Sequence, residues 1–166
     1  MQLMKKLYII RHAKSSWNKL NLEDFDRPLN KRGKKDAPFM GKILLEKGVI
    51  PDVIISSPAK RAKQTSIRIA KELRFKKVII FDKKIYEAGP SVLEQILFSF
   101  DNINNTILLV GHNPGLNILV GNLVHFHGNI PTSGIIELSF DCERWSEISP
   151  KNATLVSFDY PKRHNL

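Results

Sequence analysis

The sequence is poor in cysteine and in long apolar runs, and both shortages exclude classes of protein. Cys142 is the single cysteine among 166 residues, so the chain can form no internal disulfide and has no second thiolate to share a metal. No apolar run approaches the roughly 20 residues that a membrane-spanning helix needs. The N-terminal MQLMKKLYII has no small-residue cleavage site after its apolar stretch, which argues against a signal peptide. We therefore expect a cytoplasmic protein with no membrane partner, in which Cys142 is a small packing residue.

The sequence also lacks the signatures of several enzyme classes. It contains no GxxxxGK[ST] loop, no GxGxxG, no GxSxG and no HExxH, which argues against a nucleotide kinase and a serine hydrolase. His125 and His127 form a His-x-His pair, but no third ligand stands at a useful spacing, and a metal site usually needs three or four. We expect structural or surface roles for these two histidines, and no metal or cofactor.

Charge is the strongest bias in the composition. The chain has 26 Lys and Arg against 16 Asp and Glu, a formal charge of +10, with 42% apolar and 25% charged residues. This excess suits nucleic acid, an anionic membrane surface or a phosphorylated substrate. No interleaved aromatics and no nucleic-acid-binding motif are present, so nucleic acid is not an expected partner. Length and composition predict one domain over 1–166, and the short chain without an added arm predicts a monomer.

Short apolar runs alternate with helical patterns, which is typical of βαβ units and therefore of an α/β fold. Strands are expected at 7–10, 53–56, 78–81 and 106–110, with an antiparallel pair at 135–140 and 153–158. Helices are expected at 33–47, after Ser57-Pro58 to about 73, at 91–100 and at 113–124. Ser57, a capping box from Ser91 to Glu94, and Asn113 are the expected helix starts, and Gly48 is the expected end of the first helix.

Three of the expected strands end in the same kind of residue. The first ends in Arg11-His12, the second leads through Ser57-Pro58 to Arg61, and the fourth ends in Gly111-His112. Each of these side chains alone is more simply a surface arginine or a loop histidine. In an open α/β sheet, however, ligands bind beyond the carboxyl ends of the strands. Paired guanidiniums and helix N-termini suit a phosphoryl group, and an imidazole there can attack phosphorus.

The segments around these residues are recognisable. LYIIRHAKSSWN resembles the RHG signature of the histidine phosphatase superfamily, in its phosphoglycerate mutase-like branch, with Ala13 in place of the usual glycine. SSPAKRAKQT and LLVGHNPG resemble the second arginine and second histidine motifs of that family. DFDRPLNKRG and PTSGIIEL are most similar to the SixA-type phosphohistidine phosphatases. The resemblance covers residues 7–158 and implies a three-layer α/β/α sandwich around a mostly parallel sheet with antiparallel C-terminal strands.

The resemblance also implies roles for individual residues. His12 would accept the phosphoryl group. Arg11, Arg61 and His112 would bind the oxygens of that phosphoryl group. Ser15 and Asn18 fall where members of the family add further phosphate contacts.

The sequence does not decide which residue donates a proton to the leaving group. The resemblance points to Glu87, which could instead be a solvated loop carboxylate if the leaving group needs no acid. Asp24 and Asp26 are weaker candidates, and we expect Asp26 to pair with Arg27 or Arg32.

These observations predict a metal-independent phosphatase that acts on protein phosphohistidine, or on small phosphomonoesters, through a phosphohistidine at His12. The expected partner is a phosphorylated substrate, such as a histidine-phosphorylated signalling protein. A phosphoglycerate mutase is the alternative with the same first step, and a basic nucleic-acid-binding module is the alternative from another class.

Overall fold

The computed structural model describes residues 4–164, which contain one six-stranded sheet. Its strands are β1 (Lys5–Arg11), β2 (Val53–Ser56), β3 (Ile80–Phe81), β4 (Thr106–Gly111), β5 (Ile135–Phe140) and β6 (Ala153–Asp159). They lie in the order β3-β2-β4-β1-β5-β6. The pairs β1–β4, β2–β4 and β2–β3 are parallel, whereas β5 pairs antiparallel with β1 and with β6. The predicted antiparallel C-terminal pair is thus confirmed.

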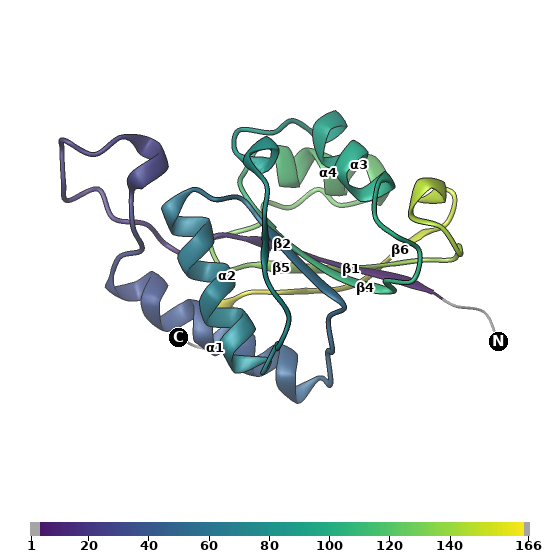
Figure 1. Ribbon diagram of the computed structural model, residues 1–166, viewed down its shortest axis with the longest axis horizontal. Coiled ribbons are helices and arrows are strands. Elements are labelled where there is room, and N and C mark those ends of the chain that lie inside the picture. The colour runs from purple at the N-terminus through teal and green to yellow at the C-terminus, as the bar shows by residue number, and fades with distance from the viewer. Residues whose placement is uncertain (1–3, 165–166) are drawn as a thin grey trace.

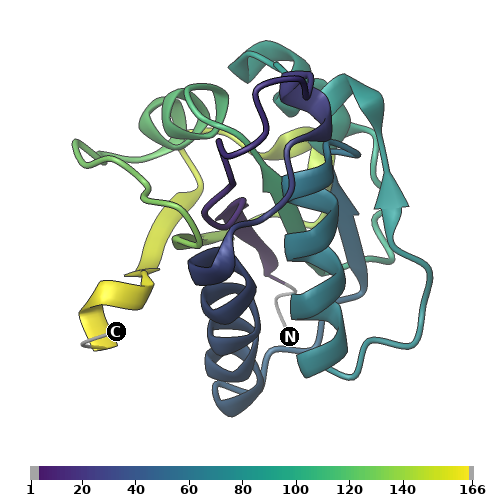
Figure 2. The same cartoon turned by 90° about the vertical axis from the view of Figure 1, so that its left-hand side faces the viewer.

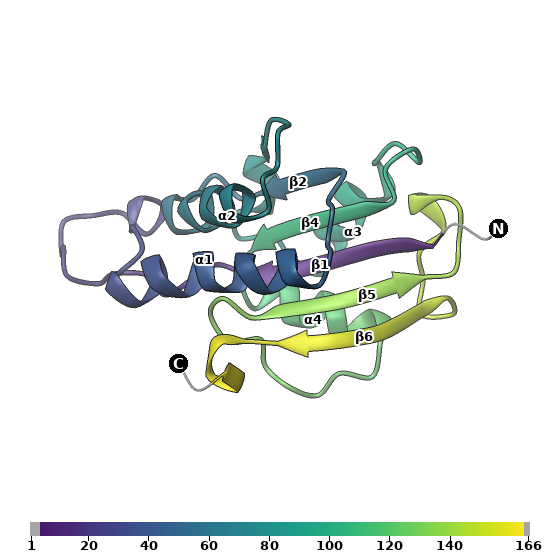
Figure 3. The ribbon, with the colours of Figure 1, turned by 90° about the horizontal axis from the view of Figure 1, so that it is seen from below.

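Two pairs of helices cover the two faces of the sheet. Helices α1 (Lys31–Glu46) and α2 (Lys60–Glu72) lie on one face, and α3 (Pro90–Phe98) and α4 (Gly115–Leu123) lie on the other (Figures 1 and 2). Figure 3 views the sheet from the side of α1 and α2 and shows that β1, β2 and β4 point toward the same edge. The predicted three-layer α/β/α sandwich is confirmed.

The strand residues alternate between two hydrophobic cores, as the period of a β-strand requires. In β1, Leu7 and Ile9 belong to the core beneath α3 and α4, while Tyr8 and Ile10 belong to the core beneath α1 and α2. Because both faces of the central strands are buried, their sequences read as continuous apolar runs rather than as alternating patterns. The carboxyl ends of β1 and β4, at Arg11 and Gly111, lie next to each other at one edge of the sheet.

The first helix has the predicted ends. Asn30 precedes α1, and its side-chain oxygen accepts a hydrogen bond from the backbone N–H of Gly33 at 2.9 Å. At the other end Gly48 has a φ of 75°, a left-handed conformation that glycine adopts without steric cost. The helix begins two residues earlier than the apolar pattern indicated, because Asn30 caps it.

The other three helix starts differ from the expectation. Helix α3 begins at Pro90 with Gly89 as its cap, so the predicted capping box from Ser91 is wrong; proline suits the first helical position because it lacks an N–H. Helix α4 begins at Gly115, two residues after Asn113. Helix α2 begins at Lys60, and the Ser57 hydroxyl accepts a hydrogen bond from Ala59 N at 3.2 Å without capping the helix itself.

The third predicted strand is shorter than expected. Only Ile80 and Phe81 form β3, and Val78 is 87% exposed. The reason is position: β3 lies at the edge of the sheet, where one side has no strand partner, so an apolar run there need not be buried. Among residues 4–164 no helix is both long enough and apolar enough to cross a membrane.

Candidate active site

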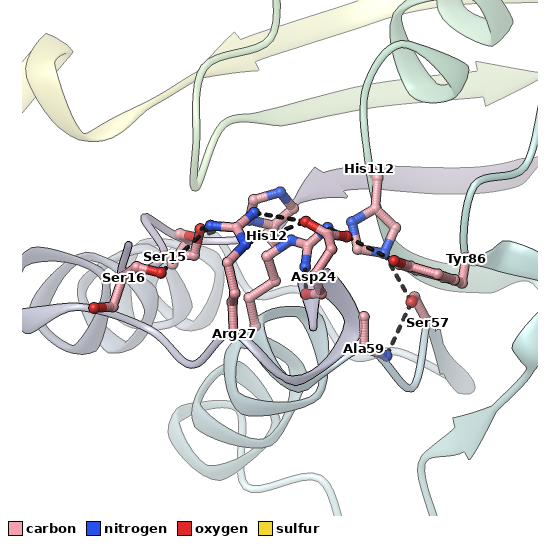
Figure 4. Close-up of polar contacts among 11 residues, drawn as sticks. His12, Ser15, Ser16, Asp24, Arg27, Ser57, Ala59, Tyr86 and His112 are labelled. Carbon is pink, nitrogen blue, oxygen red and sulfur yellow. Dashed lines mark hydrogen bonds and ion pairs between the residues drawn. The ribbon is translucent and has the colours of Figure 1, made fainter. Parts of the chain in front are cut away.

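The two histidines of the predicted site follow neighbouring strands. Strand β1 ends at Arg11, β4 ends at Gly111, and the parallel register pairs these two residues. His12 and His112 therefore leave the sheet side by side, with ring centroids 5.2 Å apart. Figure 4 shows both rings in one row with Asp24 and Tyr86. The structure thus brings together the strand ends that the sequence predicted would meet.

His12 is held as a neutral imidazole with a defined tautomer. Its Nδ1 lies 2.8 Å from the backbone oxygen of Ala13, and because a carbonyl can only accept, Nδ1 has the proton. Nε2 is left with a lone pair. Burial lowers the pKa of His12 to about 3, opposed by the bond to Ala13 and reinforced by His112, Arg61 and Arg11. A neutral nitrogen with a free lone pair is a nucleophile at neutral pH.

Ala13, which replaces the usual glycine of the resembled signature, is accommodated by local packing. Its side chain is fully buried against Leu29 and Ala37. Its N–H donates to the Thr65 hydroxyl at 2.9 Å, while its oxygen accepts from His12. The methyl group is therefore part of the packing that fixes the loop after β1.

Two arginines flank the histidines. Arg11 donates from Nη1 to the Ile130 oxygen at 2.9 Å, and burial together with neighbouring Arg61 lowers its pKa. Arg61, on the first turn of α2, is buried and donates from both Nη atoms to Asp24. In each guanidinium the buried Nε–H has no hydrogen-bond partner among the residues that the structure describes. Because unpaired buried donors are costly, these N–H groups suit an anionic ligand.

Asp24 is the counter-ion of this cluster, and its role was not anticipated. Its carboxylate lies 3.0 Å from both Arg61 Nη2 and Arg27 Nη2, and accepts from the Tyr86 hydroxyl at 2.6 Å. The Tyr86 hydrogen bond, followed by those of Arg27 and Arg61, holds the pKa of Asp24 well below its usual range. Burial, together with the same hydrogen bond to Asp24, raises the pKa of Tyr86 to about 12. The expected role of Asp26 is wrong, because Asp24 binds Arg27, and Arg32 pairs with Asp36 at 3.2 Å.

Arg27 is a second residue that the sequence did not assign to the site. It is buried and donates to Ser15 Oγ at 2.7 Å, and its guanidinium lies 3.5 Å from the centre of the Trp17 ring. Together with Asp24 it ties the loop that follows His12 to the site (Figure 4). Asp24 and Arg27 both lie in the DFDRPL segment that resembles SixA-type proteins. Their ion pair forms only in the folded conformation of this loop, so the sequence alone did not indicate it.

The predicted phosphate contacts Ser15 and Asn18 have different environments. Ser15 is buried, and its hydroxyl accepts from Arg27. Asn18 is exposed, and its backbone N–H donates to Ser16 Oγ at 3.2 Å. The hydroxyl of Ser15 thus lies within the arginine network, whereas the role of Asn18 stays a prediction.

Two contacts hold the His112 ring in place, one with Ser57 and one with Tyr86. Nε2 lies 2.8 Å from Ser57 Oγ, and the Tyr86 ring packs edge-on with centroids 5.6 Å apart. Burial, then Arg61, lowers the pKa of His112 to about 4, with Asp24 opposing this shift. His112 is therefore neutral at pH 7, like His12.

A cavity of about 330 Å³ opens beside His112. Arg61, Asp24 and Tyr86 contribute polar walls, and Ala88, Pro114 and Ile118 contribute apolar ones. Glu87, the candidate proton donor, also lines this cavity; it is exposed and has a φ of 59°. The cavity therefore places Glu87 in the same concave site as Arg61 and His112.

His125, His127 and Cys142 lie outside this cluster. His125 and His127 are exposed, and residues 4–164 contain no group of three or more His, Cys, Asp or Glu side chains placed to hold a metal ion. Cys142 is half-buried against the core under α3 and α4, in agreement with its predicted packing role.

Comparisons with known proteins agree with this arrangement. Residues 7–100 match the histidine phosphatase superfamily (branch 1). An uncharacterized protein of Mycobacterium tuberculosis is 32% identical over 165 residues, which cover 92% of this chain and all of that protein. A chloroplast protein of Arabidopsis thaliana, also uncharacterized, is 31% identical over 68% of this chain, and the match spans 56% of the plant protein.

Two further similarities have an enzyme name attached. Phosphoglycerate mutase 1 of Saccharomyces cerevisiae is 42% identical over 65 residues, 38% of this chain and 26% of the mutase. The structure of the protein histidine phosphatase SixA with tungstate superimposes with a TM-score of 0.82 at 20% identity, covering 96% of this chain and 99% of SixA. At that identity the superposition shows the shared fold. Because the family match spans more than half of the chain, the chain belongs to the histidine phosphatase superfamily.

Proposed function

We propose that the chain is a metal-independent phosphatase that transfers a phosphoryl group first to His12 and then to water. The observation that supports this most directly is the neutral His12, whose Nε2 lone pair lies among Arg11, Arg61 and His112. Guanidinium groups can neutralise the phosphoryl oxygens without a metal, and a covalent intermediate divides one displacement into two easier ones.

In the first step the lone pair of His12 Nε2 attacks phosphorus. An N–P bond forms, the bond from phosphorus to the leaving group breaks, and its electron pair stays on the leaving group, which takes up a proton. The unpartnered Nε–H groups of Arg11 and Arg61 bind the phosphoryl oxygens in this arrangement. Asp24 can keep its bonds to the Nη atoms of Arg61 while this happens.

In the second step a water oxygen attacks phosphorus, the N–P bond breaks, and its electron pair returns to Nε2. We assign the proton transfers to Glu87, which lines the cavity beside His112. It gives its proton to the leaving group in the first step and takes one from the attacking water in the second. A substrate whose leaving nitrogen is already protonated does not need the first of these transfers.

Protein phosphohistidine is the proposed substrate class, with small phosphomonoesters as weaker substrates and a histidine-phosphorylated signalling protein as the partner. The loop after β1 projects from the body at the end toward which β1, β2 and β4 point, as Figures 1 and 3 show. This loop exposes Trp17 (70%) and Leu20 (96%). Exposed apolar side chains beside a small cavity favour contact with a macromolecular substrate. The SixA neighbour is itself described as a protein histidine phosphatase.

The test is phosphate release from a phosphohistidine protein, free phosphohistidine and common phosphomonoesters, all in excess EDTA. We expect turnover in EDTA, with the highest kcat/KM for the phosphohistidine protein. His12→Ala lowers kcat by about 10³-fold or more, because the nucleophile is lost. His125→Ala is the matched control at an exposed histidine and leaves kcat unchanged.

Two results would contradict the proposal. Undiminished turnover by folded His12→Ala would exclude His12 as the nucleophile, and loss of activity in EDTA that metal restores would exclude a metal-independent reaction. Formation of isomerised phosphoglycerate instead of free phosphate would identify a mutase, which shares the first step but returns the phosphoryl group to the substrate.

A further inference from the structure

Ser57 is a buried residue whose hydroxyl contacts the second histidine of the site. It follows β2 directly, is fully buried, and its Oγ lies 2.8 Å from His112 Nε2. The same oxygen accepts a hydrogen bond from Ala59 N at 3.2 Å. Its backbone N–H donates to the Val110 oxygen at 3.0 Å, which fixes Ser57 against the end of β4.

The hydrogen bonds of Ser57 determine which nitrogen of His112 has the proton. A serine hydroxyl has one proton to donate and lone pairs to accept. The Ala59 N–H occupies a lone pair, and among residues 4–164 His112 Nε2 is the acceptor placed for the hydroxyl proton. If Nε2 had a proton instead, two donors would converge on Oγ and the hydroxyl proton would be buried without an acceptor, which is costly. Ser57 therefore donates to Nε2.

The proton of neutral His112 is then on Nδ1. This atom is buried and has no hydrogen-bond partner among the described residues. The two nitrogens of an imidazole point in diverging directions, so Nδ1 is turned away from Ser57. Figure 4 shows the His112 ring with Ser57 on one side and with Asp24 and His12 on the other. The unpartnered Nδ1–H thus lies on the side of the phosphoryl site.

We propose that Ser57 is a positioning residue that fixes His112 with its proton on Nδ1, so that this N–H donates to an oxygen of the phosphoryl group. The inference rests on the proposed phosphatase function and adds a residue to it. The opposite tautomer would direct a lone pair at an anionic oxygen and replace an attraction by a repulsion.

The surroundings of His112 agree with a neutral, tautomer-specific donor. Arg61, Arg11 and Arg27 face it with positive charge, Asp24 with negative charge, and His12 and Tyr86 with their rings. Burial of the ring, together with three cations against one carboxylate, disfavours a protonated imidazolium, so a proton on both nitrogens is not available as a substitute for tautomer control. Selection between the two neutral forms is then left to Ser57.

The direct test is the tautomer of His112, measured by ¹⁵N NMR of the imidazole in the full chain at pH 7. We expect the wild-type spectrum to show the proton on Nδ1 for His112. In Ser57→Ala this preference weakens, and Ser57→Thr, which keeps a hydroxyl, restores it. A wild-type spectrum with the proton on Nε2 would overturn the inference even if no variant folds.

Kinetics supply the second readout. Ser57→Ala is expected to lower kcat/KM by about 10-fold or more, since preorganised donors to a reacting anion contribute strongly. Ser57→Thr recovers most of the loss. The control is Ser56→Ala, because Ser56 is equally buried but its hydroxyl bonds the oxygens of Ser57 and Ala62. Unchanged kcat/KM in Ser57→Ala, or an equal loss in Ser56→Ala, would refute a positioning role. If His12→Ala keeps its activity, the proposed function fails while the tautomer measurement still decides the role of Ser57.

Discussion

Asp24 binds both arms of the Arg61 guanidinium: its backbone oxygen lies 2.7 Å from Nη1 and its carboxylate lies 3.0 Å from Nη2. An arginine of the proposed phosphoryl site is therefore oriented by a fixed counter-ion before any substrate arrives. The same carboxylate reduces the positive charge that a phosphoryl group meets. Asp24 therefore has two opposing effects: it orients Arg61 for phosphate binding, and its negative charge weakens phosphate binding. A substitution at Asp24 can measure which effect is larger.

Asp24→Asn is expected to bind inorganic phosphate more tightly, by about 3- to 10-fold. The amide oxygen can still accept a hydrogen bond, whereas the negative charge that repels the ligand is lost. Isothermal titration at low ionic strength measures the change. Asp26→Asn removes the same charge from an exposed position on the same turn and should leave Kd within about 2-fold. Weaker phosphate binding by Asp24→Asn would show that orientation by the carboxylate outweighs its charge.

The two buried histidines should make the fold less stable in acid. A histidine in the unfolded chain titrates near pH 6.5, whereas the native pKa values are about 3 for His12 and about 4 for His112. Between about pH 4 and 6.5 the unfolded chain binds protons that the native state does not, so stability rises with pH and is lost as pH falls through this window. Each group contributes at most about 1.4 kcal/mol per pH unit.

Urea unfolding of wild type and His12→Asn at pH 7.0, 5.5 and 4.5 isolates the contribution of His12. We expect wild type to lose about 2 kcal/mol more than the variant between pH 7.0 and 4.5, because the unfolded His12 takes up a proton over this range and the native His12 does not. His125→Asn, at an exposed position, should follow wild type. Parallel curves for wild type and His12→Asn would contradict the low pKa of His12.

Arg27→Ala is expected to reduce kcat/KM by about 10-fold or more, because Arg27 joins Ser15, Asp24 and Trp17 in one network. Arg27→Lys should not restore activity, since an ammonium group cannot reproduce the planar contacts of a guanidinium. The emission of Trp17 should change in both variants. Arg68→Ala, whose guanidinium bonds the Gln64 oxygen on α2, is the control. Wild-type kinetics in Arg27→Lys would show that charge alone suffices.

Gly115 separates α4 from the loop that contains Glu87. A Cβ at this position would overlap the backbone oxygen of Ala88, so Gly115→Ala forces the loop and the helix apart. We expect a loss of roughly 1–3 kcal/mol in the free energy of unfolding. Gly121→Ala lies in the same helix, meets Phe126 O at an ordinary 3.9 Å, and should gain roughly 0.4–1 kcal/mol. Equal effects of the two changes, measured by urea unfolding, would contradict the close packing at Gly115.

The sequence was informative where burial and strand geometry determine the structure. The apolar runs of β1, β2 and β4 were recognised because both faces of the sheet are covered, and His12 and His112 were placed together because parallel strands end at one edge. The predicted third strand was too long because apolar composition cannot distinguish an exposed edge from a central strand, as Val78 shows.

The parts that escaped prediction depend on long-range contacts between loops. Asp24 and Arg61 are 37 positions apart, and no local pattern indicates which acidic residue of the loop will reach the arginine. Tyr86 reaches Asp24 across 62 positions. Ser57 was identified as a helix cap because serine before proline is typical of a helix start, but its hydroxyl bonds His112. In each case a tertiary partner overrides the local preference.

The central claim is that His12 receives the phosphoryl group during turnover. Rapid mixing of excess enzyme with a phosphohistidine protein, followed by an alkaline quench that preserves phosphohistidine and by peptide mass spectrometry, measures this directly. We predict that a phosphoryl group appears on the peptide containing His12 before free phosphate is released, and that it disappears as phosphate forms. Complete single turnover with no phosphoryl group on that peptide at any time, in an enzyme that releases phosphate normally, would contradict the account.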